Sequence, residues 1–283
     1  MRNEQEMFDL ILKFAEENNT IRAVLLNGSR ANPNAKKDIF MDYDIIYMVD
    51  NTKTFIENKN WISYFGEILI MQEPDNQKLF SIEIPNEYKY TYLMQFTDGN
   101  RIDLTFAIID FVKKVCKADS QTVILMDKEN LLSKIPHPSD KSYFIKKPTE
   151  NEFIACCNEF WWISTYLAKG LWRKNLIYSL GVYYQNIHIE FMNLLRWYIG
   201  IKNNFKISSG KYDKYFEKLL PSEIYNKFLN TYPSANDINI WKAFKIMCEL
   251  FDDIAIKISN NLNFNYNNEE SKNVMNYIFG EEK

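Results

Sequence analysis

Histidine and cysteine are scarce in this chain, and their scarcity excludes a histidine-based zinc site and a disulfide framework. Only two of the 283 residues are histidine, His137 and His188, so a zinc centre built from histidines is not expected. The four cysteines form no CxxC pair, and the chain shows no secretion signal that would favour disulfides. We therefore expect reduced, buried thiols.

Long hydrophobic runs and an excess of positive charge are missing as well. No stretch approaches the roughly 18 uncharged apolar residues of a membrane helix. The N-terminal "MRNEQEMFDL" lacks the apolar core of a signal peptide. The net charge of −3 argues against a nucleic-acid-binding protein, which usually carries a basic surface. We expect a cytoplasmic protein that binds neither membrane nor nucleic acid, and its oligomeric state stays open.

The first half of the chain mixes helical and strand patterns. Apolar side chains in residues 7–15 recur at helical spacing, whereas "IRAVLLN" and "DYDIIYMV" are short apolar strands. "WISYFGEILIMQEPD" predicts a short helix followed by a third strand. Asp98-Gly99 is a turn signal between two strand-like runs in residues 91–109, which predicts a hairpin.

The second half has a different character. After the linker "IPHPSDKSYFIKKP", Thr149 and Glu152 form a capping box that opens a helix. Aromatic-rich helical stretches continue to the end, where the asparagine-rich residues 260–273 are expected to be a loop or a frayed tail. The change predicts an α+β chain. A mixed sheet with flanking helices is expected in residues 1–148 and an all-helical domain in residues 149–283.

Three aspartates are the main candidates for catalysis. Asp42 and Asp44 alternate at the head of the second strand, so they face the same side with α-carbons about 6.7 Å apart. Asp103 lies on a later strand between Ile102 and Leu104, which anchor it in the core. If these strands are neighbours, three carboxylates converge and repel one another. Mg²⁺ would remove the conflict, since it prefers carboxylates together with substrate phosphates, and a pair of such ions promotes in-line displacement at phosphorus.

A Gly-Ser turn precedes the aspartates. Gly28 lets the backbone approach a phosphate closely, and the N–H groups of a helix starting there favour an anion. Ser29 adds a hydroxyl and Arg30 a charge. The chain contains neither GxxxxGK[ST] nor GxGxxG, so a P-loop and a dinucleotide fold are not indicated. Each piece alone also fits an ordinary turn or strand end, and it is their order and spacing that favour a nucleotide site.

These motifs resemble the nucleotidyltransferase superfamily, which includes DNA polymerase beta. More narrowly, the chain is similar to the aminoglycoside 6-adenylyltransferases, which modify streptomycin. The similar stretches run from about residue 21 to about 221, with weaker similarity beyond. They are "LNGSRANPN", "KDIFMDYDI", "FGE" with "MQEPD", "TYLMQFTDGNRIDLT", "KKPT", "CCNEFWWISTYLAKGLWR", "WYIGI" and "SSGKYDKYFEKLLP".

The resemblance implies a polymerase-beta-like catalytic domain, ATP and Mg²⁺ as cofactors, and transfer of AMP to a streptomycin hydroxyl with release of pyrophosphate. By position, Gly28 and Ser29 would hold the triphosphate, and Asp42 and Asp44 would bind metal. Asp103 would be the third carboxylate, acting as the base for the attacking hydroxyl, as a metal ligand, or as both.

The helical domain would then bind the antibiotic. Streptomycin is polycationic, so its site should offer carboxylates and aromatic faces. Glu159 and Glu190 are the candidates, with a solvated helix glutamate as the alternative for each. Three tryptophans in apolar helical stretches are expected to be core residues: Trp161, Trp162 and Trp197.

Two lysines complete the candidate residues. Lys211 and Lys214 in "SSGKYDKY" could reach the triphosphate, or could be solvated surface lysines. The catalytic motif alone also fits transfer to another aminoglycoside, to a lincosamide, or to a protein hydroxyl as in toxin–antitoxin modules. A non-catalytic nucleotide-binding module is a further alternative, although the presence of all three carboxylates argues against it.

Overall fold

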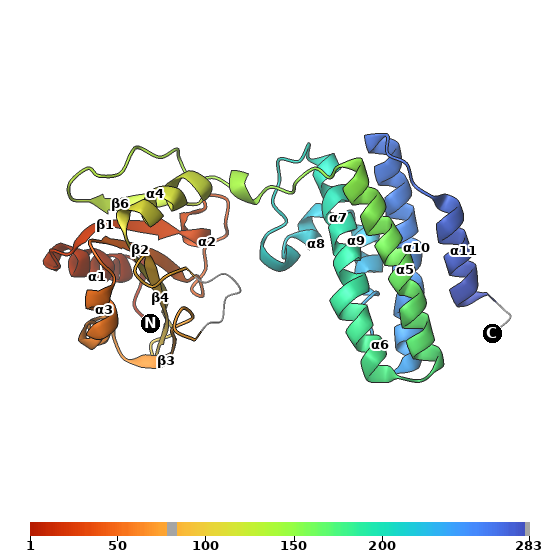
Figure 1. Cartoon of the computed structure of the whole chain (residues 1–283), viewed down its shortest axis with the longest axis horizontal. Helices are drawn as coiled ribbons and strands as arrows, with labels where there is room; N and C mark the ends of the chain where they lie inside the picture. The colour runs from red at the N-terminus through yellow and green to blue at the C-terminus, as the bar shows by residue number, and fades with distance from the viewer. Residues whose placement is uncertain (78–83, 281–283) are drawn as a thin grey trace. The chain divides into compact units, whose positions relative to one another are not determined.

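The computed structural model describes residues 1–77 and 84–280 and divides into two compact units, Met1–Ser142 and Tyr143–Lys283 (Figure 1). The first unit combines a six-stranded sheet with helices, and the second is helical. The α+β class predicted from the sequence is therefore confirmed. Every helix among the described residues is too short or too polar to cross a membrane.

The first unit is built on a mixed sheet. Its strands are β1 (Ile21–Asn27), β2 (Tyr43–Val49), β3 (Ile68–Gln72), β4 (Lys89–Phe96), β5 (Arg101–Ala107) and β6 (Val123–Asp127). Their order is β3-β4-β5-β2-β1-β6, with β2 and β5 parallel and the other neighbours antiparallel. Its helical segments are α1 (Glu4–Glu17), α2 (Gly28–Ala31), α3 (Lys53–Glu57), η1 (Asn60–Phe65) and α4 (Ile109–Ala118), and the short η2 (Lys141–Tyr143) includes the last residues of this unit and the first of the next.

The two faces of the sheet are covered by different helices. Helix α1 buries Ile11 on one face, where the Tyr47 hydroxyl donates a 2.7 Å hydrogen bond to the Ile11 carbonyl. Helix α4 buries Val112 on the other face, against Ile46 and Met48 of β2. Because both faces of β2 are covered, its continuous apolar pattern is the one expected of a central strand.

The predicted hairpin is present between β4 and β5. Gly99 in its turn has a φ of +88°, which glycine adopts readily. Asp98 in the same turn accepts a 2.7 Å hydrogen bond from Nε of Arg2 and another from the backbone of Asn100. Burial raises the pKa of Asp98, but the hydrogen bonds from Arg2 and Asn100 outweigh burial and hold that pKa below its ordinary value.

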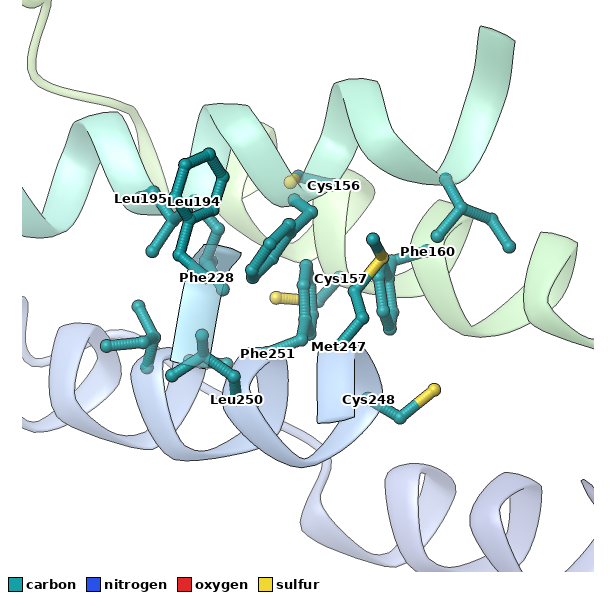
Figure 2. Packing of buried hydrophobic residues seen from close by; sticks show 14 of the residues in the cluster. Cys156, Cys157, Phe160, Leu194, Leu195, Phe228, Met247, Cys248, Leu250 and Phe251 are labelled. Carbon is teal, nitrogen blue, oxygen red and sulfur yellow. The ribbon is translucent and has the colours of Figure 1, made fainter. Parts of the chain in front are cut away.

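The second unit is a helical bundle. Its elements are α5 (Glu150–Trp172), α6 (Leu176–Val182), the π-helical turn η3 (Tyr183–Ile187), α7 (His188–Lys202), η4 (Lys211–Asp213), α8 (Phe216–Leu219), α9 (Ser222–Leu229), α10 (Asp237–Leu262) and α11 (Asn268–Phe279). Helices α5, α7 and α10 run side by side (Figure 1). Figure 2 shows their shared core, in which Phe160 of α5 stacks on Phe251 of α10 with ring centroids 3.6 Å apart.

The start of the bundle follows the prediction, and its end does not. The Thr149 and Glu152 capping box opens α5 as expected. Residues 260–273 were expected to be a loop, but α10 continues to Leu262 and α11 begins at Asn268. Helix α11 forms because Asn267 caps it and because Ile278 buries itself in the core of the bundle.

The three tryptophans differ in burial. Trp161 is 1% exposed, as expected of a core residue, and Trp197 is partly buried against the same core. The prediction for Trp162 is wrong, since its side chain is 59% exposed on the outer face of α5. The apolar stretch of α5 is long enough to contain residues of both faces, so hydrophobicity alone did not separate them.

Candidate active site

The starts of β2 and β5 lie side by side in the sheet. They are parallel neighbours, and Asp44 stands directly opposite Asp103. Ile102 and Leu104 are buried, whereas Asp103 between them turns to the opposite face, as the alternation predicts. Strand β2 begins at Tyr43, so Asp42 lies one residue before the strand instead of in it. Strands β2 and β5 are therefore neighbours, as the hypothesis of three converging carboxylates requires.

The Gly28 turn packs directly against one of these carboxylates. Gly28 has a φ of +70°, and a Cβ placed on it would lie 2.3 Å from Oδ2 of Asp44. Only glycine permits this approach, because any side chain would displace the carboxylate and strain the backbone. Ser29 follows in the one-turn helix α2, half-buried beside the same strand ends. The turn and the carboxylate thus share one small space.

Arg101, the first residue of β5, lies among the three carboxylates. Its Nε and Nη2 donate hydrogen bonds of 2.7 and 2.8 Å to the two carboxylate oxygens of Asp103. The same Nε is 3.7 Å from Oδ2 of Asp42. The hydrogen-bonded Asp103 raises the pKa of Arg101 against the effect of burial, and the charges of Asp42 and Asp44 add to the increase. No role for Arg101 is predicted from the sequence, although the alternation of β5 places it on the same face as Asp103.

Arg30 has a different environment from the one expected of a phosphate ligand. Its side chain is 5% exposed, and it donates hydrogen bonds to the backbone carbonyls of Met41 and Asp42 at 2.6 and 3.2 Å. Its guanidinium also lies 3.8 Å from the centre of the Tyr43 ring. Through these contacts the guanidinium holds the segment that precedes β2. Arg30 therefore helps to position Asp42, and its role in cofactor binding stays a prediction.

The chemistry of the three carboxylates fits Mg²⁺, which prefers oxygen ligands of this kind. Their arrangement does not form a closed cage: in residues 1–77 and 84–280, no group of three or more Asp, Glu, His or Cys side chains is placed to hold a metal ion. The guanidinium of Arg101 places a positive charge beside Asp42 and Asp103. Asp42, Asp44 and Asp103 stay the predicted metal ligands, and the guanidinium of Arg101 contacts two of them.

In the helical unit, the two candidate glutamates come from neighbouring helices. Glu159 is exposed on α5, on the same face as Trp162, whose Nε1 donates a hydrogen bond to the Tyr166 hydroxyl. Glu190 lies in the first turn of α7, and its backbone carbonyl accepts a hydrogen bond from Sγ of Cys156, one helical turn before Glu159. A carboxylate and an exposed aromatic side chain therefore lie together on α5, the combination expected for a cationic ligand.

The two candidate lysines flank a loop residue that is tied to α7. Asp213, between Lys211 and Lys214, is 6% exposed and forms hydrogen bonds of 2.9 and 2.6 Å with the guanidinium of Arg196. Arg196 also donates a hydrogen bond to Asn193, which in turn donates a 3.3 Å hydrogen bond to Glu190. One polar network thus connects the lysine loop with a candidate substrate ligand, all within the helical unit.

Comparison with known proteins places the chain in a family. The family profile described as streptomycin adenylyltransferase matches residues 1–280. The chain belongs to the streptomycin adenylyltransferase family. The match includes the carboxylates of the first unit and the candidate residues of the second. The resemblance inferred from the sequence motifs is confirmed.

Individual members of the family are similar over nearly their whole length. An aminoglycoside 6-adenylyltransferase from Staphylococcus aureus is 38% identical over 98% of this chain and 98% of its own length. The enzyme of the same name from Campylobacter jejuni is 34% identical over 100% of this chain and 97% of its own length. A crystal structure of an aminoglycoside 6-adenyltransferase from Bacillus subtilis aligns with 99% of this chain and 98% of its own, with 30% sequence identity and a TM-score of 0.48.

Proposed function

We propose that this chain transfers AMP from ATP to a hydroxyl of an aminoglycoside antibiotic, with the 6-hydroxyl of streptomycin as the expected acceptor. Membership of the streptomycin adenylyltransferase family and the names of its relatives support this activity. The structural observation that carries it is the pairing of Asp44 with Asp103 beside the Gly28 turn. Modification of the antibiotic would confer resistance, and the dependence on ATP argues for a reaction in the cytoplasm.

The reaction is a displacement at the α-phosphorus of ATP. The antibiotic hydroxyl oxygen forms a bond to that phosphorus, the bond from the phosphorus to the bridging oxygen of the β-phosphate breaks, and pyrophosphate leaves. Asp103 accepts the proton of the attacking hydroxyl. Gly28 and Ser29 hold the triphosphate through their backbone and hydroxyl groups. Asp42 and Asp44 would hold Mg²⁺, which would supply positive charge to neutralise the phosphates.

The helical unit supplies the antibiotic site in this proposal. Glu159 and Glu190 offer negative charge to a cationic sugar, and Trp162 offers an exposed aromatic face on the same helix as Glu159. Lys211 and Lys214 are the candidates for a contact with the triphosphate. The ion pair that Arg196 forms with the buried Asp213 between them would keep both lysines in place.

An assay of pyrophosphate release tests the proposal. Purified protein is incubated with ATP, Mg²⁺ and, in turn, streptomycin, other aminoglycosides, a lincosamide and no acceptor. Release that depends on streptomycin supports the proposal, whereas release that depends on a different acceptor would redirect it to that class. Release with none of these acceptors would contradict transfer to an antibiotic.

Variants of the carboxylates test the residue roles in the same assay. Asp42→Asn and Asp44→Asn should abolish transfer with the fold intact, because each removes a ligand charge for the metal. Asp103→Asn should lower kcat by about 10²–10⁴-fold and leave the affinity for ATP unchanged, as expected of a general base. Asp9→Asn, an exposed position on α1, is the control and should retain wild-type activity. Loss of ATP binding in Asp103→Asn would instead identify Asp103 as a metal ligand first.

A further inference from the structure

Arg101 is the one positively charged side chain that contacts two of the three candidate metal ligands, within the part of the unit that the structure describes. Its Nε and Nη2 donate hydrogen bonds of 2.7 and 2.8 Å to the two carboxylate oxygens of Asp103. The same Nε lies 3.7 Å from Oδ2 of Asp42. Such a two-pronged contact is the strongest that an arginine makes with a carboxylate. The third carboxylate, Asp44, is opposite Asp103 in the register of β2 and β5. Arg101 thus places a positive charge beside Asp103 and Asp42.

We propose that Arg101 is a positioning residue that makes metal binding depend on the nucleotide. Without ATP, the guanidinium holds Asp103 and offsets part of the negative charge of the site. A free divalent cation would have to share these carboxylates with the guanidinium at a short distance, where like charges repel. ATP brings the negative charge of its triphosphate, which restores the attraction for a divalent cation. The metal therefore binds together with the nucleotide, and the guanidinium of Arg101 keeps Asp103 oriented until then.

Solvent exposure does not remove this effect. The side chains of Arg101 and Asp42 are 39% and 37% exposed, which would weaken a single ion pair. The pair with Asp103 is different, because Asp103 is only 20% exposed and both of its oxygens are engaged. Arg101 also lies 3.7 Å from Asp42, so its charge acts on both carboxylates at once.

The test measures metal binding in the absence of catalysis, and it rests on the metal roles in the proposed function. Mn²⁺ stands in for Mg²⁺, and free Mn²⁺ is measured by electron paramagnetic resonance with and without a nonhydrolysable ATP analogue. Arg101→Gln removes the charge, and Arg101→Lys keeps the charge but loses the fork. Arg22→Gln is the matched control. Arg22 also pairs with two carboxylates, Asp50 and Glu129, but at the opposite end of β2.

The wild type should bind Mn²⁺ weakly alone and much more tightly with the analogue. Arg101→Gln should bind Mn²⁺ alone about tenfold more tightly than the wild type, as expected from the loss of one charge near the site. Arg101→Lys should lie between them, and Arg22→Gln should match the wild type. The lysine variant also keeps the test valid if the glutamine variant does not fold, since tighter binding of Mn²⁺ alone is expected there as well.

Two other results separate the failure of this inference from the failure of the proposed function. If Arg101→Gln binds Mn²⁺ alone no more tightly than the wild type, while the analogue still promotes binding in both, Arg101 does not gate the metal and the inference is wrong. If the wild type binds no Mn²⁺ even with the analogue, Asp42 and Asp44 are not metal ligands. The proposed role of Arg101 is then wrong as well.

Discussion

Replacing Gly28 with alanine should inactivate the enzyme much more than it destabilises the fold. The left-handed φ of +70° should cost alanine about 1–2 kcal/mol of the free energy of unfolding. The new Cβ would lie 2.3 Å from Oδ2 of Asp44, whereas ordinary contacts begin at 3.4 Å, so the carboxylate would retreat by about 1 Å. A displacement of that size in a reacting group lowers the rate by about 10²-fold.

Two assays separate these effects. Streptomycin-dependent pyrophosphate release should show kcat reduced about 10²-fold, and urea denaturation should show the smaller loss of stability. Gly181→Ala in α6 is the control, because no atom lies within 4 Å of its added Cβ. It should retain kcat and gain about 0.5–1 kcal/mol, since alanine favours a helix. A folded Gly28→Ala protein with wild-type kcat would refute the reasoning that Asp44 must stay against the glycine.

Three further substitutions test other parts of the structure. Arg196→Met should lower the free energy of unfolding by roughly 3 kcal/mol, because it leaves the buried carboxylate of Asp213 without a cation; an unchanged urea midpoint would contradict this. Glu159→Gln should raise the KM for streptomycin but not for ATP, with the exposed Glu223→Gln as control, and an unchanged KM would remove Glu159 from the site. The pKa of Asp98 is lower in the folded protein than in the unfolded chain, where it is near 4. Asp98 therefore stabilises the fold above that pH, and this stabilisation is lost as the pH falls. Asp98→Asn should accordingly make Tm less dependent on pH on the acid side.

Local patterns in the sequence were sufficient to predict most of the first unit. The apolar tail of β2 predicted a central strand, and the alternation in β5 predicted which side chains face the core. The resemblance to a family then supplied roles for the carboxylates. The position of Arg101 could not be predicted in the same way. Its contact with Asp42 depends on the parallel pairing of two strands that are far apart in the sequence.

The helical unit shows a second reason why sequence patterns were insufficient. Asparagine-rich residues favour turns, but in α11 a capping asparagine and a buried Ile278 outweighed that preference. The left-handed conformation of Tyr212 and Asp213 has no local signal, because non-glycine residues rarely adopt it. The ion pair between the buried Asp213 and Arg196, a residue from another element, holds that conformation in place.

The pairing of β2 with β5 also has a consequence for how the enzyme folds. These strands become neighbours only after the chain between them, with its own strands and turns, has closed into a long loop. Long-range closures of this kind are slow, because the entropy is lost before the new contacts compensate for it. A partly folded chain would therefore contain all three acidic residues and still lack the site. The appearance of activity during refolding should coincide with completion of the sheet, and neither nucleotide nor antibiotic could hasten its earlier steps.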